Sequence, residues 1–426
     1  MRVEVLVVGA GPAGSAAAIH LARRGREVLL VDRCRFPRRK PCGEYYNPEA
    51  VRLLGALGVL PAMRGAGAGS IGALAVGASG GCSLTAPFSR VAGGVEALSL
   101  GREVLDTLLV DAAREAGVRV WEGVEVLEPL LDAGRVVGAR CREQQTPRTP
   151  VSCRHPASPG SVERSERAGS QHPPGAPETE VRAEIVLAAD GLRSRFARRL
   201  GLAVGDGGRR KFGVTARCTP VPGAAGRIMM QPGPGGSCGL VARRDEANLG
   251  MVVDGARLRE LGGNPARFFA AALAEFPALA DAVAGPVHDV LTVGPLTWIT
   301  RHQVSAGCLL LGDAAGFYDP FTGQGVTFAL LTAALAAEVA DAALADVDVS
   351  ASRLTEYSRR RQQLLGTRVL VQKGVQVVME RPWLREQVLE RLSRRPAAAS
   401  LLLGVIADVL PPARLLHPDF ARRLLL

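Results

Sequence analysis

Three glycines near the start of the chain have the spacing of a loop that binds phosphate groups. Residues 9–14 read Gly-Ala-Gly-Pro-Ala-Gly. Gly9 permits a tight turn, Gly11 lets the backbone approach a pyrophosphate, and Gly14 lets the following helix pack closely on the preceding strand. That helix would begin at Pro12 and Ala13, with its first N–H groups and its partial positive charge facing the phosphates. The loop therefore predicts a dinucleotide site.

An acidic residue follows at the distance that such a site requires. Residues 5–8 predict a buried strand before the loop, residues 15–24 predict the helix after it, and residues 28–31 predict a second strand. Asp32 ends this second strand, where its carboxylate would accept hydrogen bonds from an adenosine ribose. Arg33, next in the chain, is a further candidate contact to the cofactor. These elements indicate a dinucleotide without separating FAD from NAD(P).

The composition is typical of a large globular protein in a reducing compartment. A length of 426 residues suggests two or three domains, and 47% hydrophobic residues suffice for packed cores. The net charge of +11 comes almost wholly from dispersed arginines, and we find no nucleic-acid-binding motif, so we expect no nucleic acid partner. The eight cysteines show neither a Cys-x-x-Cys pair nor a metal-ligand spacing, which predicts free thiols and no metal site.

Two further stretches differ from the rest. Residues 141–180 are rich in Pro, Ser, Gly and charge, which predicts a disordered insertion between two strands. Residues 346–426 predict helices with arginine-rich faces, broken at prolines. The apolar residues 401–410 could rest on a membrane surface, but we favour packing on the main body. Because no run reaches about eighteen uninterrupted apolar residues and no signal peptide is evident, we expect a cytoplasmic protein without a spanning helix.

Three separated elements together resemble a known superfamily. Residues 9–14 with Asp32, then Asp190-Gly191, then Gly312-Asp313 follow the order found in FAD-dependent oxidoreductases of the aromatic-hydroxylase fold. This superfamily includes flavin monooxygenases and geranylgeranyl reductases, and the resemblance covers roughly residues 1–345. It implies an α/β fold: a Rossmann-like FAD-binding domain, an inserted antiparallel β-sheet substrate domain and a C-terminal helical region.

The resemblance also implies how the chain is divided. The FAD-binding domain would take three parts, the substrate domain two, and the helices the remainder. The FAD-binding domain would comprise residues 1–80, 101–205 and 298–345. The substrate domain would comprise residues 81–100 and 206–297, and the C-terminal helical region residues 346–426.

The family's cofactor-binding residues are carried over position by position. In the family, the acid of the last motif contacts the ribityl or ribose chain, which implies that role for Asp313 beside Gly312. The turn after it lies along the pyrophosphate and flavin ring. Asp190 matches an acid that stabilises the FAD-binding loops, and Arg102 matches an arginine that contacts the cofactor. The corresponding residues of the turn are Ala314, Gly323, Gln324 and Gly325.

Residues 36–44, FPRRKPCGE, and 312–325, GDAAGFYDPFTGQG, look most like the geranylgeranyl reductase and electron-transfer dehydrogenase branch. Cys42 lies where that branch has a cysteine near flavin and substrate. A packing role for this small side chain is an equal alternative. Geranylgeranyl reductases also carry an aromatic strand motif, Y-x-W-x-F-P, whereas residues 235–242 here contain no aromatic residue. A wide apolar site would remain, but a specific prenyl pocket is not implied.

These observations lead to three functional hypotheses. The first is an FAD-dependent oxidoreductase that reduces or dehydrogenates a C–C bond of an apolar lipid-, isoprenoid- or polyketide-like metabolite, free or bound to a carrier. Flavin N5 would carry the hydride, and Cys42, Glu44 or Tyr45 would handle the proton. The second is an FAD-dependent monooxygenase acting through a flavin hydroperoxide. The third is a non-catalytic lipid- or carrier-binding protein. Because no second GxGxxG is present, NAD(P)H or an external electron carrier would dock only transiently.

Overall fold

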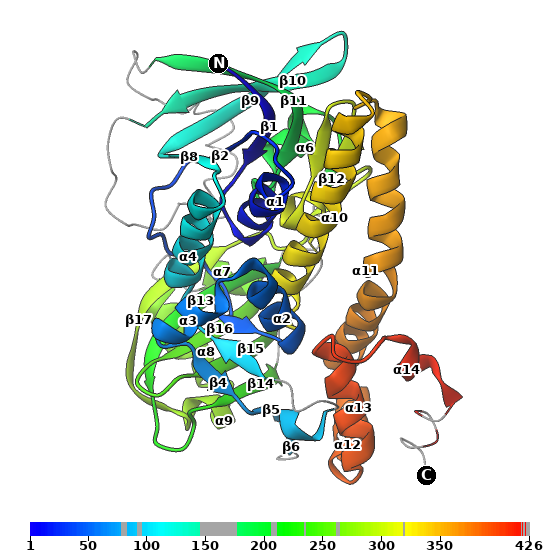
Figure 1. Ribbon diagram of the computed structural model, residues 1–426. Coiled ribbons are helices and arrows are strands. Elements are labelled where there is room, and N and C mark those ends of the chain that lie inside the picture. The colour runs from blue at the N-terminus through cyan, green and yellow to red at the C-terminus, as the bar shows by residue number, and fades with distance from the viewer. Residues whose placement is uncertain are drawn as a thin grey trace.

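The computed structural model describes residues 1–77, 83–91, 96–144, 177–205, 211–233, 236–260, 265–317, 320–418, 420 and 422. Two large β-sheets occupy opposite ends of the molecule, and helices lie between and beside them (Figure 1). The larger part of the predicted insertion, 145–176, lies outside the described residues. At its borders the chain is regular, because β10 (Arg135–Glu143) and β11 (Glu178–Ala188) pair antiparallel through Arg142 and Glu178. The insertion is therefore shorter than residues 141–180.

The first sheet has β1 (Arg2–Val8) in its centre. Val8 lies opposite both Val31 and Ala188, and Ala188 lies opposite Leu310. Since these strands are parallel, their carboxyl ends meet at one edge of the sheet, where ligands of such sheets bind. The parallel strands are, in spatial order, β20 (Cys308–Leu310), β11, β1, β2 (Val28–Asp32) and β8 (Arg119–Glu122), and β19 (Val304–Ser305), β9 (Val124–Asp132) and β10 add antiparallel pairs.

Helices rich in small residues cover this sheet. In α1 (Pro12–Ala22) the side chains of Ala16, Ala17 and Ala18 are fully buried, which lets α1 pack against both α10 (Gly325–Ala345) and α4 (Arg102–Glu115). In the part of the chain that the structure describes, α10 is the one helix long and apolar enough to cross a membrane. The sequence prediction of no spanning helix was based on the length of uninterrupted apolar runs, whereas α10 reaches this apolar character as an average over its length. The α10 residues Ala333, Ala336 and Ala340 are buried in the same core as α1, so packing accounts for their apolar character.

The second sheet is formed by segments far apart in the chain. Its pairs are antiparallel, except that β5 runs parallel to β14. The sheet therefore includes residues 73–77, which the expected division places in the FAD-binding domain. The strand order is β17 (Val283–Val293), β13 (Lys211–Pro220), β16 (Ala247–Asp254), β15 (Gly236–Ala242), β14 (Arg227–Gly233), β5 (Ala73–Gly77) and β6 (Ser83–Pro87).

Short elements complete the two sheets. Phe268, Phe269 and Phe276 are buried in a core that the second sheet shares with the nearby helices α8 and α9. A small sheet of β3, β7 and β4 joins the chain around residue 45 to the segment before α4. The bounds are α7 (Gly255–Glu260), α8 (Pro265–Leu273), α9 (Pro277–Ala280), β3 (Tyr45–Tyr46), β4 (Gly69–Ile71), β7 (Ala97–Ser99), α2 (Pro48–Leu57), α3 (Leu60–Gly65), α6 (Arg195–Arg199), β12 (Ala203–Gly205), β18 (Ile299–Thr300) and the 3-10 turns η1 (Phe88–Arg90) and η2 (Gly312–Ala315).

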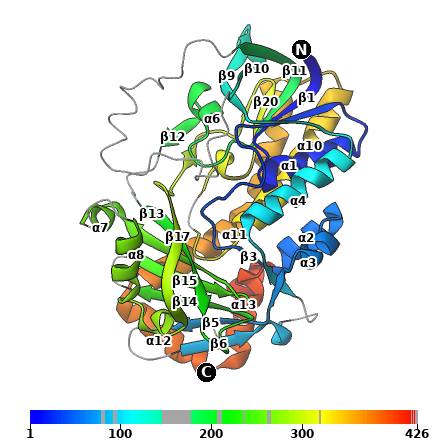
Figure 2. The ribbon, with the colours of Figure 1, turned by 90° about the vertical axis from the view of Figure 1, so that its left-hand side faces the viewer.

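The C-terminal helices pack on the body of the molecule. The long helix α11 (Ala351–Glu380) lies along α10, and α12 (Pro382–Ser393) and α13 (Pro396–Ile406) contact β6. Figure 2 shows α12 and α13 beside the second sheet, at the opposite end of the molecule from β9 and β10. The helices start at Pro382 and Pro396, as the sequence predicts, and α14 (Ala413–Leu416) follows Pro412. Leu403 and Val405 are buried, which agrees with the prediction that residues 401–410 pack on the main body of the protein.

The expectation of free thiols is wrong at one position. Cys42, Cys141, Cys218, Cys238 and Cys308 are free. Cys34 is disulfide-bonded. The absence of a local Cys-x-x-Cys pair gives no information about pairing between cysteines that are distant in the sequence, which explains the error.

A buried tyrosine tests how α11 is fixed to the first sheet. The hydroxyl of Tyr357 donates a hydrogen bond to the Leu310 carbonyl oxygen at 3.0 Å, and the side chain is fully buried. We expect Tyr357→Phe to lower the free energy of unfolding by about 1–2 kcal/mol, because the buried carbonyl loses its partner. Thr355→Ala removes an exposed hydroxyl from the same helix and should change stability by less than about 0.5 kcal/mol. Equal denaturation midpoints for both variants would contradict this account.

Candidate active site

The glycine loop has the geometry that its sequence predicts. Gly9 has a φ of +98°, and a Cβ there would lie 2.4 Å from the Ala189 carbonyl oxygen. A Cβ on Gly14 would lie 1.8 Å from the Gly9 carbonyl oxygen. Gly11 differs, since the one atom near its Cβ position is Arg38 Nη2 at 3.6 Å. Gly9 and Gly14 therefore serve the packing of the chain on itself, while Gly11 leaves room for another molecule to approach the backbone.

The start of α1 has free donors beside that space. Gly11 is the N-cap, and no side chain caps the helix. Pro12 and Ala13 occupy the first turn, which contains no acidic residue. Unpaired N–H groups and the helix dipole together favour an anion at this end.

Asp32 supports the loop directly. Its Oδ2 accepts a hydrogen bond from the Ala10 N–H at 2.7 Å, and its Oδ1 accepts one from the Cys34 N–H at 2.8 Å. Each carboxylate oxygen has a second lone pair, so the expected contact with a ribose stays compatible with these bonds. Arg33 is exposed next to it.

A buried ion pair lies at the start of α4. Arg102 donates two hydrogen bonds to Asp106, at 2.8 and 2.9 Å, in a bidentate pair. Burial acts to lower the pKa of Arg102, but the charge and hydrogen bonds of Asp106, together with Cys42 and Tyr46, outweigh it, and the pKa is raised well above its usual value. Burial acts in the opposite sense on Asp106, yet Arg102 and Arg38 hold the pKa of this carboxyl below its usual range. Arg102 is therefore committed to Asp106 and positioned at the edge of the sheet.

Sequence reasoning missed two cations at this edge. Arg38 Nη2 lies 3.3 Å from Asp106 Oδ2 and 3.7 Å from Asp32 Oδ2, and Arg38 Nε is buried without a partner. The pKa of Lys40 is lowered by burial and by Arg102, although Asp313 opposes this. Its Nζ lies 3.8 Å from the position of a Cβ on Gly191. The basic run FPRRK at residues 36–40, shortly after Asp32, was the available signal.

The second and third motifs end at the same edge of the sheet. Asp190 Oδ2 accepts hydrogen bonds from the N–H groups of Arg195 and Phe196, at 2.7 and 3.3 Å, and so fixes the start of α6. Burial raises the pKa of Asp190. Gly312 has a φ of +54°, and a Cβ there would lie 2.8 Å from the Ala13 Cβ. The Gly312-Asp313 turn therefore packs directly on the glycine loop.

The turn before α10 resembles the glycine loop in leaving the start of its helix without a side-chain cap. The Gly323 N–H bonds the Pro320 carbonyl at 3.0 Å, and Gly323 has a φ of +67°. Gln324 is the N-cap of α10 without capping it through its side chain, and the space at Gly325 is open. Gln324 Nε2 donates to Asp408, whereas its Oε1 is buried without a partner.

Of the three catalytic candidates, Cys42 and Tyr45 remain available for proton transfer. Cys42 is half-buried, and its Sγ accepts a weak hydrogen bond from the Glu44 N–H at 3.5 Å. The Tyr45 ring lies against the turn before α10, because a Cβ on Gly323 would be 2.8 Å from its Cδ1. Burial, with Asp408 nearby, raises the pKa of Tyr45.

Glu44 connects the loop to the second sheet. It has a φ of +55°, and its carboxylate accepts hydrogen bonds from Arg243 Nη1 at 3.1 Å and from Arg217 Nη2 at 3.4 Å. Arg217 also pairs with Glu103 of α4, and both arginines pair with Glu246. Because two arginines already bind its carboxylate, Glu44 suits positioning better than proton transfer.

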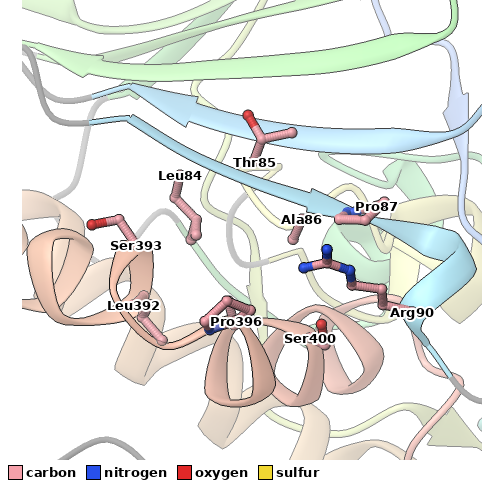
Figure 3. A pocket seen from close by; sticks show the side chains of 10 residues that line it. Leu84, Thr85, Ala86, Pro87, Arg90, Leu392, Ser393, Pro396 and Ser400 are labelled. Carbon is pink, nitrogen blue, oxygen red and sulfur yellow. The ribbon is translucent and has the colours of Figure 1, made fainter.

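An apolar cluster continues from Tyr45 to a surface groove. Tyr45 and Phe88 stack with ring centroids 6.5 Å apart, and Val91 belongs to the same buried cluster as Phe88. Val91 also lines a groove between η1 and α13, with Leu401 and Leu410. A neighbouring pocket lies between β6 and α12, and Figure 3 shows Leu84, Leu392 and Pro396 in its wall with Arg90 at one side.

These contacts show which predicted residues lie together. The glycine loop, Asp32, Arg102, Asp190 and the Gly312-Asp313 turn converge at one edge, and the Gly323–Gly325 turn meets Tyr45 beside it. Within the described ranges, no three His, Cys, Asp or Glu side chains gather as metal ligands. The residues present fit FAD: a loop with space at Gly11, cations beside it for a pyrophosphate, and unpartnered polar atoms on Arg38 and Gln324.

Comparison with known proteins agrees with this geometry. Residues 2–157 match the family model described as FAD binding domain. Over 379 residues the chain is 30% identical to digeranylgeranylglycerophospholipid reductase 1 of Methanopyrus kandleri. The aligned region covers 84% of this chain and 86% of that protein. A stretch of 56 residues, 13% of this chain and 14% of the other, is 59% identical to menaquinone reductase of Mycobacterium tuberculosis.

The fold is also found among solved structures. The myxobacterial chondrochloren halogenase, described as a variant of FAD-dependent halogenases, superposes with a TM-score of 0.73 over 87% of this chain and 82% of the halogenase. At 22% identity this likeness shows the fold alone. The relationship to the reductases extends over most of both chains, so the protein is an FAD-dependent oxidoreductase of the aromatic-hydroxylase fold and belongs to the digeranylgeranylglycerophospholipid reductase family.

Proposed function

We propose that this protein reduces carbon–carbon double bonds in the isoprenoid chain of a lipid or quinone. The observation that carries the proposal is the 30% identity, over 86% of its length, to a reductase whose name describes a digeranylgeranyl lipid. The short, more similar match to a menaquinone reductase supports a prenylated quinone as an alternative carrier of the chain. The absence of aromatic residues at 236–242 in β15 argues for an apolar site without the aromatic strand motif of the family.

The protein's own residues would bind the cofactor and position the substrate. Bound FAD supplies the hydride for such a reduction. The free N–H groups at the start of α1, with Arg38 and Lys40, would hold its pyrophosphate, and Asp313 would contact its ribityl chain. The N–H group of Gly325 would face the ring, and Gly323, whose own N–H is bonded to Pro320, would hold the turn in shape. NAD(P)H, or an external electron carrier, would reduce the flavin without a binding domain of its own.

Reduction of a double bond also needs a proton at the second carbon. We assign the role of proton donor to Cys42. The stacked rings of Tyr45 and Phe88 would form the wall of the substrate site, because they lie between the turn at Gly323 and the surface groove. Tyr45, whose pKa is raised, would keep its own hydroxyl neutral against the substrate. Glu44 would hold the Cys42 loop against Arg217 and Arg243. A monooxygenase reaction on a similar substrate is the competing outcome.

Two glycine variants should separate cofactor binding from folding. We expect Gly11→Ala to keep the stability of the FAD-free protein, because its Cβ has room, and to weaken FAD binding at least tenfold by blocking the phosphates. Gly14→Ala should prevent folding, since its Cβ would lie 1.8 Å from a backbone oxygen. Circular dichroism and FAD fluorescence titration measure the two effects. Unchanged FAD affinity in folded Gly11→Ala protein would contradict the assignment of the loop.

The reaction type is decided by the need for oxygen. We expect NADPH or a chemical reductant to bleach the flavin absorbance, and the reduced protein to saturate an isoprenoid chain without oxygen. Mass spectrometry should detect a gain of two hydrogens per double bond under strict anaerobiosis. An oxygenated product that forms only in air would establish the monooxygenase instead.

Removal of the Cys42 thiol tests the proton donor. We expect Cys42→Ala to lower kcat about a hundredfold or more while FAD content stays the same, because positioned acids typically contribute this much. Cys141→Ala is the matched control: this thiol is buried in β10, and burial raises its pKa to about 11. Equal turnover by the two variants would show that Cys42 is a packing residue.

A further inference from the structure

A carboxylate from the C-terminal region reaches the turn before α10. Asp408 follows α13 and has a φ of +59°, a left-handed conformation that few residues other than glycine adopt. Its side chain is 1% exposed. It accepts hydrogen bonds from Asn47 Nδ2 at 3.0 Å, Gln324 Nε2 at 2.8 Å and Arg368 Nε at 2.9 Å. The donors belong to the N-caps of α2 and α10 and to the middle of α11.

An ionised carboxylate can only accept hydrogen bonds, so it fixes the orientation of both amides. Each must turn its NH₂ group to Asp408 and its oxygen away. For Asn47 that oxygen is fully used, because Oδ1 accepts from the Ala50 N–H at 2.9 Å and the Thr327 hydroxyl at 2.6 Å. For Gln324 the oxygen is buried without a partner. The same arrangement thus leaves one free acceptor, on the residue between Gly323 and Gly325.

A buried acceptor without a partner is costly, so its retention points to a donor that the protein chain does not supply. The oxidised flavin ring carries an N–H group at N3, and we have proposed that the neighbouring turn faces this ring. Gln324 lies at the N-terminus of α10 and is 3% exposed, so its amide group stays in this place even when its oxygen and NH₂ group exchange positions.

We propose that Asp408 is a positioning residue that orients the Gln324 amide, so that its carbonyl oxygen accepts a hydrogen bond from an N–H group of the flavin ring. This inference rests on the proposed cofactor site. It gives the C-terminal region a direct role in that site: Asp408 acts through Gln324 and is itself held by Arg368 of α11.

The isosteric variant Asp408→Asn tests this orientation. Arg368 is a pure donor, so the new carbonyl oxygen would stay on Arg368 and the new NH₂ would face Gln324. The bond from Asn47 would be lost in the variant, because the Asn47 oxygen is occupied and its amide cannot turn over. Gln324 would then turn its own oxygen to that NH₂ and present a donor to the flavin. Asparagine tolerates the left-handed conformation, so the fold should persist.

We expect FAD-loaded Asp408→Asn protein to show a shifted visible absorption spectrum, a changed flavin midpoint potential and at least tenfold weaker FAD binding. Gln324→Leu removes the amide and serves as the second arm. If Asp408 acts through Gln324, adding Asp408→Asn to Gln324→Leu should change the spectrum and the dissociation constant no further.

Two results would overturn the proposal. One is a purely structural effect of Asp408→Asn. The variant would then lower the melting temperature of the FAD-free protein but leave the flavin spectrum and potential unchanged, or its effects on FAD would add fully to those of Gln324→Leu. The other is a normal spectrum and FAD affinity in Gln324→Leu itself. The Gly11→Ala variant separates a wrong assignment of the turn at Gln324 from a wrong assignment of the whole cofactor site. If only the turn is misassigned, Gly11→Ala still weakens FAD binding at least tenfold.

Discussion

The site depends on how closely three backbone segments approach one another at Gly9. The loop after β1 lies so near the end of β11 and the first turn of α1 that a Cβ on Gly9 or on Gly14 would overlap a carbonyl oxygen. Gly312 packs against Ala13 with a similar lack of room. Because these contacts involve main chain, they leave little tolerance for shifts. The residues that follow each strand are therefore held in fixed positions relative to one another, as preorganised binding requires.

Charge is distributed around this frame in two networks that share one loop. On one side, Arg38, Lys40 and Arg102 surround Asp106 and leave positive charge beside the glycine loop. On the other, Glu44 joins Arg217 and Arg243 of the second sheet. The loop of residues 36–44 thus connects the surroundings of the glycine loop to the second sheet. Since Cys42 lies in this loop, both networks contribute to its position.

Local patterns were enough to predict the glycine loop, the strands of the first sheet and the proline-bounded helices, because turn chemistry and apolar runs act over a few residues. Pairing between distant segments left no such trace. The parallel pairing of β5 with β14 moved residues 73–77 to the second sheet, and the disulfide of Cys34 was equally hidden. Asp408 meets Gln324 across 84 residues, with no motif to mark it. Arg38 and Lys40 were visible as a basic run, but only the fold shows that they turn inward. The catalytic role of Cys42 stays a prediction.

The arrangement of the first sheet has a consequence for biogenesis. Its strands come from residues 2–8 and from residues 308–310, and the whole of β13 to β17 is made between them. The edge of the first sheet around the glycine loop can therefore be completed only after translation has passed both sheets, and folding must wait for contacts of very high sequence separation. FAD would then bind late in folding, and its binding would stabilise the native state relative to the unfolded chain.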